Sequence, residues 1–146
     1  MTTHPDFEDF LRLLEAHCVD YMIVGGYAVA YHGYPRFTKD IDIFFSDDPA
    51  NLTRLQEALV EFGFGVASVP LETLAQPDCM LVIGNEPVRI DLMNRIAGVA
   101  FAEARTGAVR GRYGSVAVTF IGKSDLLHNK RSTGRQRDLG DVEELS

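Results

Sequence analysis

The chain has 146 residues, of which 46% are hydrophobic, two cysteines and a formal net charge of −7. This length suits a single domain over residues 1–146 with a buried core, and the negative charge argues against a surface built to coat nucleic acid. No apolar run approaches the roughly 20 residues of a membrane span. The N-terminus lacks a secretory signal pattern, and the cysteines suggest neither a disulfide framework nor a zinc cluster. We therefore expect a cytoplasmic protein.

Helical and extended patterns alternate along the first half of the chain. In order, they predict a helix that starts near Pro5, a strand over 19–24, a short helix over 27–32, a strand over 39–45 and a helix opened by Asp48-Pro49.

Strands dominate the expectations for the second half. In order, the pattern predicts strands over 64–69, 80–83 and 88–93, a partly helical stretch over 94–114, a strand over 116–121 and two short helices around Thr133-Gly134. Helices mixed with strands in this way predict an α/β (α+β) fold with a mixed sheet flanked by helices.

Two aspartates separated by one residue, Asp40 and Asp42, lie on the predicted strand over 39–45. Side chains two apart on a strand point to the same face, so we expect the two carboxylates to lie side by side. Like charges at that distance repel and need a cation for stability. Carboxylate oxygens that leave room for substrate phosphates suit Mg²⁺. The pair therefore predicts a magnesium site that handles phosphate.

The pair Gly25-Gly26 follows the preceding strand. A strand that enters a helix through glycines leaves backbone N–H groups accessible to an anion. Such a pair is more often an ordinary tight turn. Its position ahead of Asp40 and Asp42 favours phosphate binding instead. Arg36 and Lys39, which precede the second strand, could also reach phosphate oxygens.

A third carboxylate, Asp91, alternates with Ile90 and Leu92 on the predicted strand over 88–93. A buried carboxylate needs a partner, and Arg89 on the same face could supply one. Given the other two aspartates, we favour metal ligation or general-base work for Asp91. Three carboxylates on neighbouring strands can hold two cations, one lowering the pKa of an attacking hydroxyl and one clamping a triphosphate.

The order Gly-Gly, helix, Asp-x-Asp and later strand aspartate resembles the nucleotidyltransferase (DNA polymerase β-like) superfamily. The thirteen residues between Gly26 and Asp40 fit its longer-spaced branch, which includes the aminoglycoside and lincosamide nucleotidyltransferases and the abortive-infection toxin type. Much of the chain is similar to small bacterial proteins classed as nucleotidyltransferases, over 21–45, 88–93, 98–104 and 121–145.

The resemblance implies a nucleotidyltransferase-type sheet, with Asp40, Asp42 and Asp91 as metal-binding and catalytic acids and Gly25 and Gly26 as the triphosphate-binding turn. Position 26 departs from the frequent Gly-Ser, which leaves only backbone donors there.

The resemblance also implies phosphate contacts from lysines near the C-terminus, for which Lys123 and Lys130 are the candidates. A run of charges is otherwise a solvated face. For Asp138 we expect a supporting role that orients Lys130 or Arg135 rather than metal binding.

Together these features predict an enzyme that uses two Mg²⁺ ions to move a nucleoside monophosphate from an NTP, with ATP as the first candidate, to a hydroxyl or phosphate acceptor, releasing pyrophosphate. The acceptor stays open between a small molecule, tRNA and a protein. One alternative is a toxin–antitoxin component that acts on tRNA or a partner protein, and another is a non-catalytic nucleotide-binding module of the same fold. Because the chain is short for a transferase with two substrates, a homodimer or a partner protein could complete the site.

Overall fold

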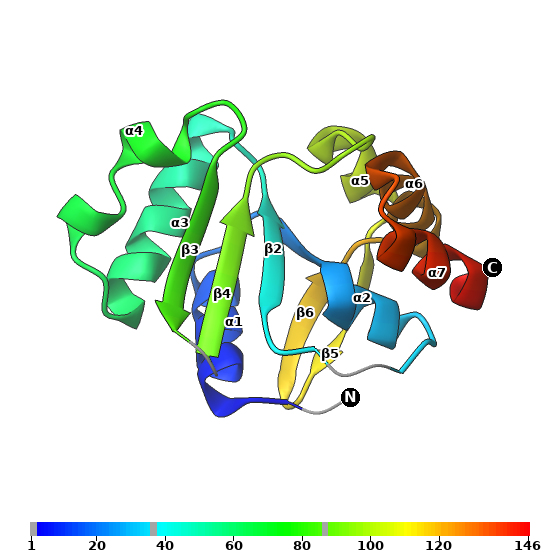
Figure 1. Cartoon of the computed structure of the whole chain (residues 1–146). Coiled ribbons are helices and arrows are strands. Elements are labelled where there is room, and N and C mark those ends of the chain that lie inside the picture. Colours follow the sequence, from blue (N-terminus) through cyan, green and yellow to red (C-terminus); the bar gives the residue numbers. More distant parts are fainter. Residues whose placement is uncertain (1–2, 36–37, 86–87) are drawn as a thin grey trace.

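The computed structural model of the chain describes residues 3–35, 38–85 and 88–146, which form a mixed sheet with helices around it (Figure 1). The α-helices are α1 (Pro5–Ala16), α2 (Gly25–Tyr31), α3 (Pro49–Phe62), α4 (Leu71–Leu74), α5 (Phe101–Gly107), α6 (Lys123–Thr133) and α7 (Gln136–Leu145), and η1 (Val66–Ser68) is a 3₁₀ turn. The strands are β1 (Tyr21–Val24), β2 (Ile41–Phe45), β3 (Met80–Asn85), β4 (Val88–Met93), β5 (Val109–Tyr113) and β6 (Val116–Phe120).

The described strands form a six-stranded sheet in the order β3-β4-β2-β1-β6-β5. The pairs β2–β4 and β1–β6 are parallel and the other neighbours are antiparallel, which confirms the predicted mixed sheet. Helices α1 and α3 pack together behind the sheet in Figure 1, and the Phe10 and Phe62 rings, 5.2 Å apart, join them. Helices α5, α6 and α7 gather at the other side of the view. No described helix is long and apolar enough to cross a bilayer.

Alternation along the central strands separates the core from the polar face. Ile41 and Ile43 of β2 and Ile90 and Leu92 of β4 are buried. The residues between them must therefore face the other side of the sheet. In the β2–β4 register, Asp42 lies directly opposite Asp91. The buried core thus holds the strands that carry the two carboxylates.

One expectation about local structure is wrong and another is incomplete. The segment 64–69 contains η1 instead of a strand, and Val66 is 59% exposed there, so the apolar run has no sheet face to cover. The stretch 94–114 contains the expected helix, α5, but also β5, an edge strand paired with β6. On the inward side of β5, between the exposed Arg110 and Arg112, Gly111 has no side chain to pack, which weakens the apolar signal of a strand.

Candidate active site

Three carboxylates and the glycine pair line one cavity of about 650 Å³. Asp42 lies on β2 and Asp91 on β4, while Asp40 lies just before β2 and not within it as the strand over 39–45 would have required. Gly25 and Gly26, the first residues of α2, line the same cavity. The strand pairing brings these residues together. Asp42 is the register partner of Val24, the last residue of β1, as well as of Asp91.

Gly25 and Asp42 are in direct contact. A Cβ atom at position 25 would collide with the Asp42 carboxylate, and Gly25 has a φ of +67°, a conformation that side-chain-bearing residues rarely adopt. A Cβ at position 26 would lie 2.8 Å from Thr38 Oγ1. Both glycines therefore keep backbone close to the polar wall of the cavity, where a larger residue would displace that wall.

The charge on Asp42 is costly in the metal-free protein. Burial, followed by the nearby carboxylates of Asp91 and Asp40, raises the pKa of Asp42 to about 7. Lys130 acts in the opposite direction but does not outweigh these effects. The carboxylates thus repel one another across the cavity and would gain from a cation between them.

Arg89 partly supplies that positive charge. Its Nε donates to Asp91 Oδ1 at 2.9 Å and lies 3.8 Å from Asp40 Oδ2. This is the ion pair that the alternation on β4 suggested. On the other side of the same carboxyl group, Asp40 Oδ1 is buried and has no hydrogen-bond donor among the described residues. An orphaned carboxylate oxygen of this kind is expensive unless something charged binds it.

The donor set fits Mg²⁺ in its chemistry. Mg²⁺ prefers hard carboxylate oxygens beside a cavity with room for phosphate and water. Asp40 Oδ1, which has no hydrogen-bond donor among the described residues, is an oxygen that such an ion could bind. The described residues nevertheless hold no group of three or more acidic, His or Cys side chains already arranged around a metal position. The Arg89 guanidinium contacts two of the three carboxylate groups instead. Metal binding would therefore have to compete with Arg89.

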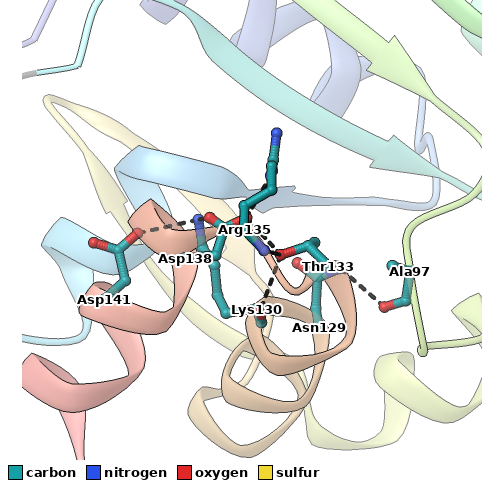
Figure 2. Close-up of polar contacts among 7 residues, drawn as sticks. All are labelled: Ala97, Asn129, Lys130, Thr133, Arg135, Asp138 and Asp141. Atoms are coloured by element: carbon teal, nitrogen blue, oxygen red, sulfur yellow. Dashed lines mark hydrogen bonds and ion pairs between the residues drawn. The ribbon is translucent and has the colours of Figure 1, made fainter.

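A buried ion-pair network between α6 and α7 also contributes residues to the lining of the cavity (Figure 2). Lys130 of α6 is 6% exposed, and its Nζ lies 2.8 Å from Asp138 Oδ1 and 3.3 Å from Asp141 Oδ2, both on α7. Arg135 Nε and Thr133 Oγ1 each donate to Asp138 Oδ2 at 2.6 Å. Burial by itself would raise the pKa of Asp138, but these hydrogen bonds outweigh it and lower that pKa. Asp138 contacts both basic residues that it was expected to orient.

The network is tied to the sheet through Asn129, whose Nδ2 donates to the Ala97 carbonyl oxygen at 2.9 Å (Figure 2). Ala97 belongs to the segment after β4, so this bond connects α6 to the chain that follows the strand carrying Asp91. Sequence reasoning missed Asn129, as it missed Thr38, whose Oγ1 donates to the Asp40 carbonyl oxygen at 3.2 Å. Neither residue belongs to a motif, although Thr38 immediately precedes Lys39-Asp40.

The predicted basic residues are placed differently from one another. Lys39, Arg135 and Arg137 are exposed and line the cavity, and the buried Lys130 lines it as well. Lys123 is exposed at the first residue of α6 and is not among the residues that line this cavity in the described part of the chain. Its expected phosphate contact therefore has no support from the cavity. Arg36 lies outside the described residues.

Comparisons with known proteins agree with this architecture. A comparison with curated protein sequences gave no significant match. Among solved structures, a candidate nucleotidyltransferase from Thermotoga maritima superposes with a TM-score of 0.60 at 12% identity, covering 98% of this chain and 90% of that one. The lincosamide antibiotic adenylyltransferase LnuA, solved with lincomycin bound, superposes with a TM-score of 0.56 at 16% identity, covering 99% of this chain and 96% of that one. At these identities the structures share the fold.

A family model covers nearly the whole sequence. Residues 3–146 match the family described as "Nucleotidyl transferase of unknown function (DUF2204)". The chain therefore belongs to this family of nucleotidyl transferases.

Proposed function

We propose that this nucleotidyl transferase is Mg²⁺-dependent and moves a nucleoside monophosphate from an NTP, with ATP as the first candidate, to a hydroxyl or phosphate acceptor. The acceptor oxygen forms a bond to the α-phosphorus, the α–β phosphoanhydride bond breaks, and pyrophosphate leaves with the bonding electrons. When the acceptor is a hydroxyl, its proton passes to the Asp91 carboxylate. The reaction needs no other co-substrate.

The residues of the cavity would take different roles in binding the metal and the phosphates. Asp40, Asp42 and Asp91 would hold Mg²⁺, which when bound stabilises the charge that develops on the phosphates and the attacking oxygen. Backbone N–H groups at Gly25 and Gly26 are proposed to bind phosphate oxygens. Lys130, held by its ion pairs with α7, and the exposed Lys39 would add positive charge to the triphosphate site.

One observation carries the proposal. Asp42 is the register partner of both Val24 and Asp91, so the end of β1, the glycine pair and the carboxylates meet at one cavity. A structural role alone does not account for this placement, because Asp40 Oδ1 has no donor among the described residues and the pKa of Asp42 is raised, both of which are unfavourable without a cation.

Isothermal calorimetry with Mg²⁺ and each of the four NTPs tests the proposal. At least one NTP should bind, only weakly without Mg²⁺, and Asp42→Asn should weaken that binding at least tenfold. Asp47→Asn, an exposed neighbour, is the matched control and should bind like the wild type. No heat with any NTP, together with an unaltered thermal transition, would remove the catalytic proposal, since a ligand of the native state must stabilise it.

A toxin that modifies tRNA or a partner protein is the second candidate. It is favoured by the basic residues that line the cavity, Lys39, Arg95, Arg135 and Arg137, because a polyanionic acceptor would gain from them. Expression of the chain should then arrest growth, and Asp40→Ala should restore it. Normal growth at high expression of the wild type counts against this candidate and leaves the small-molecule acceptor.

A further inference from the structure

Three apolar side chains lie beside the carboxylates on the open edge of the sheet. Met80 and Val82 of β3 are 54% and 46% exposed, and Met93 of β4 is partly buried. We refer to Met80, Val82 and Met93 as the apolar shelf. Single exposed apolar residues are common, but these three are neighbours, and two of them, Met80 and Met93, line the cavity that contains Asp91.

The sheet register makes the shelf and the site one surface. Val82 is the register partner of Asp91, and Met80 is the register partner of Met93. Paired residues on neighbouring strands present their side chains to the same face. β3 is one of the two edge strands of the described sheet, and α1 and α3 lie behind β3 and β4 in Figure 1. The shelf therefore continues the floor of the cavity to the edge of the sheet.

The strand order puts the elements of the site in a row. The shelf lies on β3 and β4, Asp91 follows on β4, Asp42 on β2, and Gly25 comes directly after β1. The groups proposed to bind phosphate are the glycine pair, Lys39 and Lys130 of α6. The shelf is thus separated from the glycine pair by the carboxylates.

In-line displacement gives this order a chemical meaning. The attacking and leaving oxygens of a phosphoryl transfer lie roughly opposite each other across the phosphorus. If pyrophosphate leaves toward the glycine pair, the acceptor oxygen must approach from the side of Asp91. An acceptor placed there lies over Met93, Val82 and Met80, which offer apolar contact and few polar partners.

We propose that the apolar shelf binds a hydrophobic part of the acceptor, which is a molecule with an aliphatic or aromatic group next to its reactive hydroxyl. The inference rests on the function proposed above and narrows its substrate class. Methionine side chains suit such a surface, because they are flexible and adapt to ligands of different shape. A polar acceptor such as a bare sugar would gain little from it.

Primary alcohols from ethanol to hexanol are the probes for a kinetic test. With Mg²⁺ and ATP, the alkyl ester of AMP and free AMP are counted by mass spectrometry, so that transfer to water is the internal reference. The ester-to-AMP ratio at equal alcohol concentration should rise by about twofold to fourfold for each added methylene, the upper value being complete burial. Met80→Lys should flatten this dependence and Met80→Leu should keep it. Val66→Lys, at an exposed residue of η1, is the control and should behave like the wild type.

A binding test works without turnover. The chain has four methionines, and the ε-methyl NMR signals of Met80 and Met93 should shift with hexanol, whereas that of the fully buried Met22 should not. If the enzyme turns over but the ester-to-AMP ratio does not depend on the length of the alcohol, this inference is overturned and the proposed function stays in place. No turnover with water or any alcohol counts against the proposed function, and the methyl titration then decides the shelf by itself. Shifts caused by Mg²⁺ and ATP but not by hexanol would assign the shelf to the nucleoside and overturn the inference.

Discussion

The Asp42 carboxylate lies against the backbone of Gly25, in the space that a Cβ atom at position 25 would fill. The first glycine of the pair is therefore required by the carboxylate as well as by any phosphate. This relationship joins two features that appear independent in the sequence, because sixteen residues lie between them (26–41).

Gly25→Ala should consequently damage the site more than backbone strain explains. Strain from a side chain at φ +67° costs about 1–2 kcal/mol, and the collision with Asp42 adds displacement of a carboxylate. We expect at least a tenfold weaker Mg²⁺-dependent NTP binding together with lowered stability. Gly134→Ala is a φ-matched control, since Gly134 has a φ of +68° and nothing within 4 Å of its Cβ position. Equal losses of NTP binding in the two variants would contradict the role of Asp42.

Asp42→Asn should stabilise the metal-free protein at pH 8 while it weakens NTP binding. The pKa of Asp42 is raised to about 7, so the folded state binds a proton that the unfolded state has already lost at lower pH. Its contribution to stability is therefore complete below the unfolded value of 3.8 and is lost as the pH rises through 7. The amide removes that penalty, and each pKa unit corresponds to about 1.4 kcal/mol.

Chemical denaturation of both proteins in EDTA at pH 5 and pH 8 measures this effect. The gain from Asp42→Asn should be clearly larger at pH 8 than at pH 5, and Asp47→Asn should give no gain at either pH. A variant less stable than the wild type at pH 8 would mean that the repulsion between the carboxylates is already compensated.

The sequence predicted the central strands because every second residue in them is apolar and buried. Ile41, Ile43, Ile90 and Leu92 alternate with the aspartates and are all buried, so the pattern and the burial agree. It did not predict β5, where Gly111 interrupts the inward-facing residues, or the 3₁₀ turn at 66–68, whose apolar residues are exposed. Patterning identifies an element where apolar side chains fill one of its faces.

Within the candidate site, the motif identified the acids and glycines but not their surroundings. Local spacing suggested that Arg89 pairs with Asp91, whereas the contact of Asn129 with Ala97 joins residues 32 apart and needs the fold. The apolar shelf could not be predicted from the sequence either. Met80 becomes a neighbour of the site only through the β3–β4 register.

Lys130→Met should cost far more stability than Arg135→Ala, although both residues contact Asp138. The Lys130 side chain is 8% exposed and lies between two carboxylates that are themselves 3% and 4% exposed, and removing one member of a buried pair costs about 3–5 kcal/mol. The Arg135 side chain is 73% exposed, so its loss should cost less than about 1 kcal/mol. Urea denaturation compares the two free energies of unfolding. Similar losses would show that the α6–α7 network is not held by Lys130.

Arg89→Met should make the protein depend more strongly on Mg²⁺. Arg89 contacts Asp91 and lies near Asp40, so its removal leaves charged, partly buried carboxylates without that partner. We expect the metal-free protein to lose about 1–3 kcal/mol and to recover most of it when Mg²⁺ binds, because the ion then neutralises the same oxygens without competition from the guanidinium. Thermal melting in EDTA and in Mg²⁺ measures both quantities. Arg12→Met, which removes the exposed pair with Asp9, should show the Mg²⁺ response of the wild type. If Arg89→Met also responded to Mg²⁺ only as the wild type does, the guanidinium and the cation would not share a site, and the carboxylates would not be the place where Mg²⁺ binds.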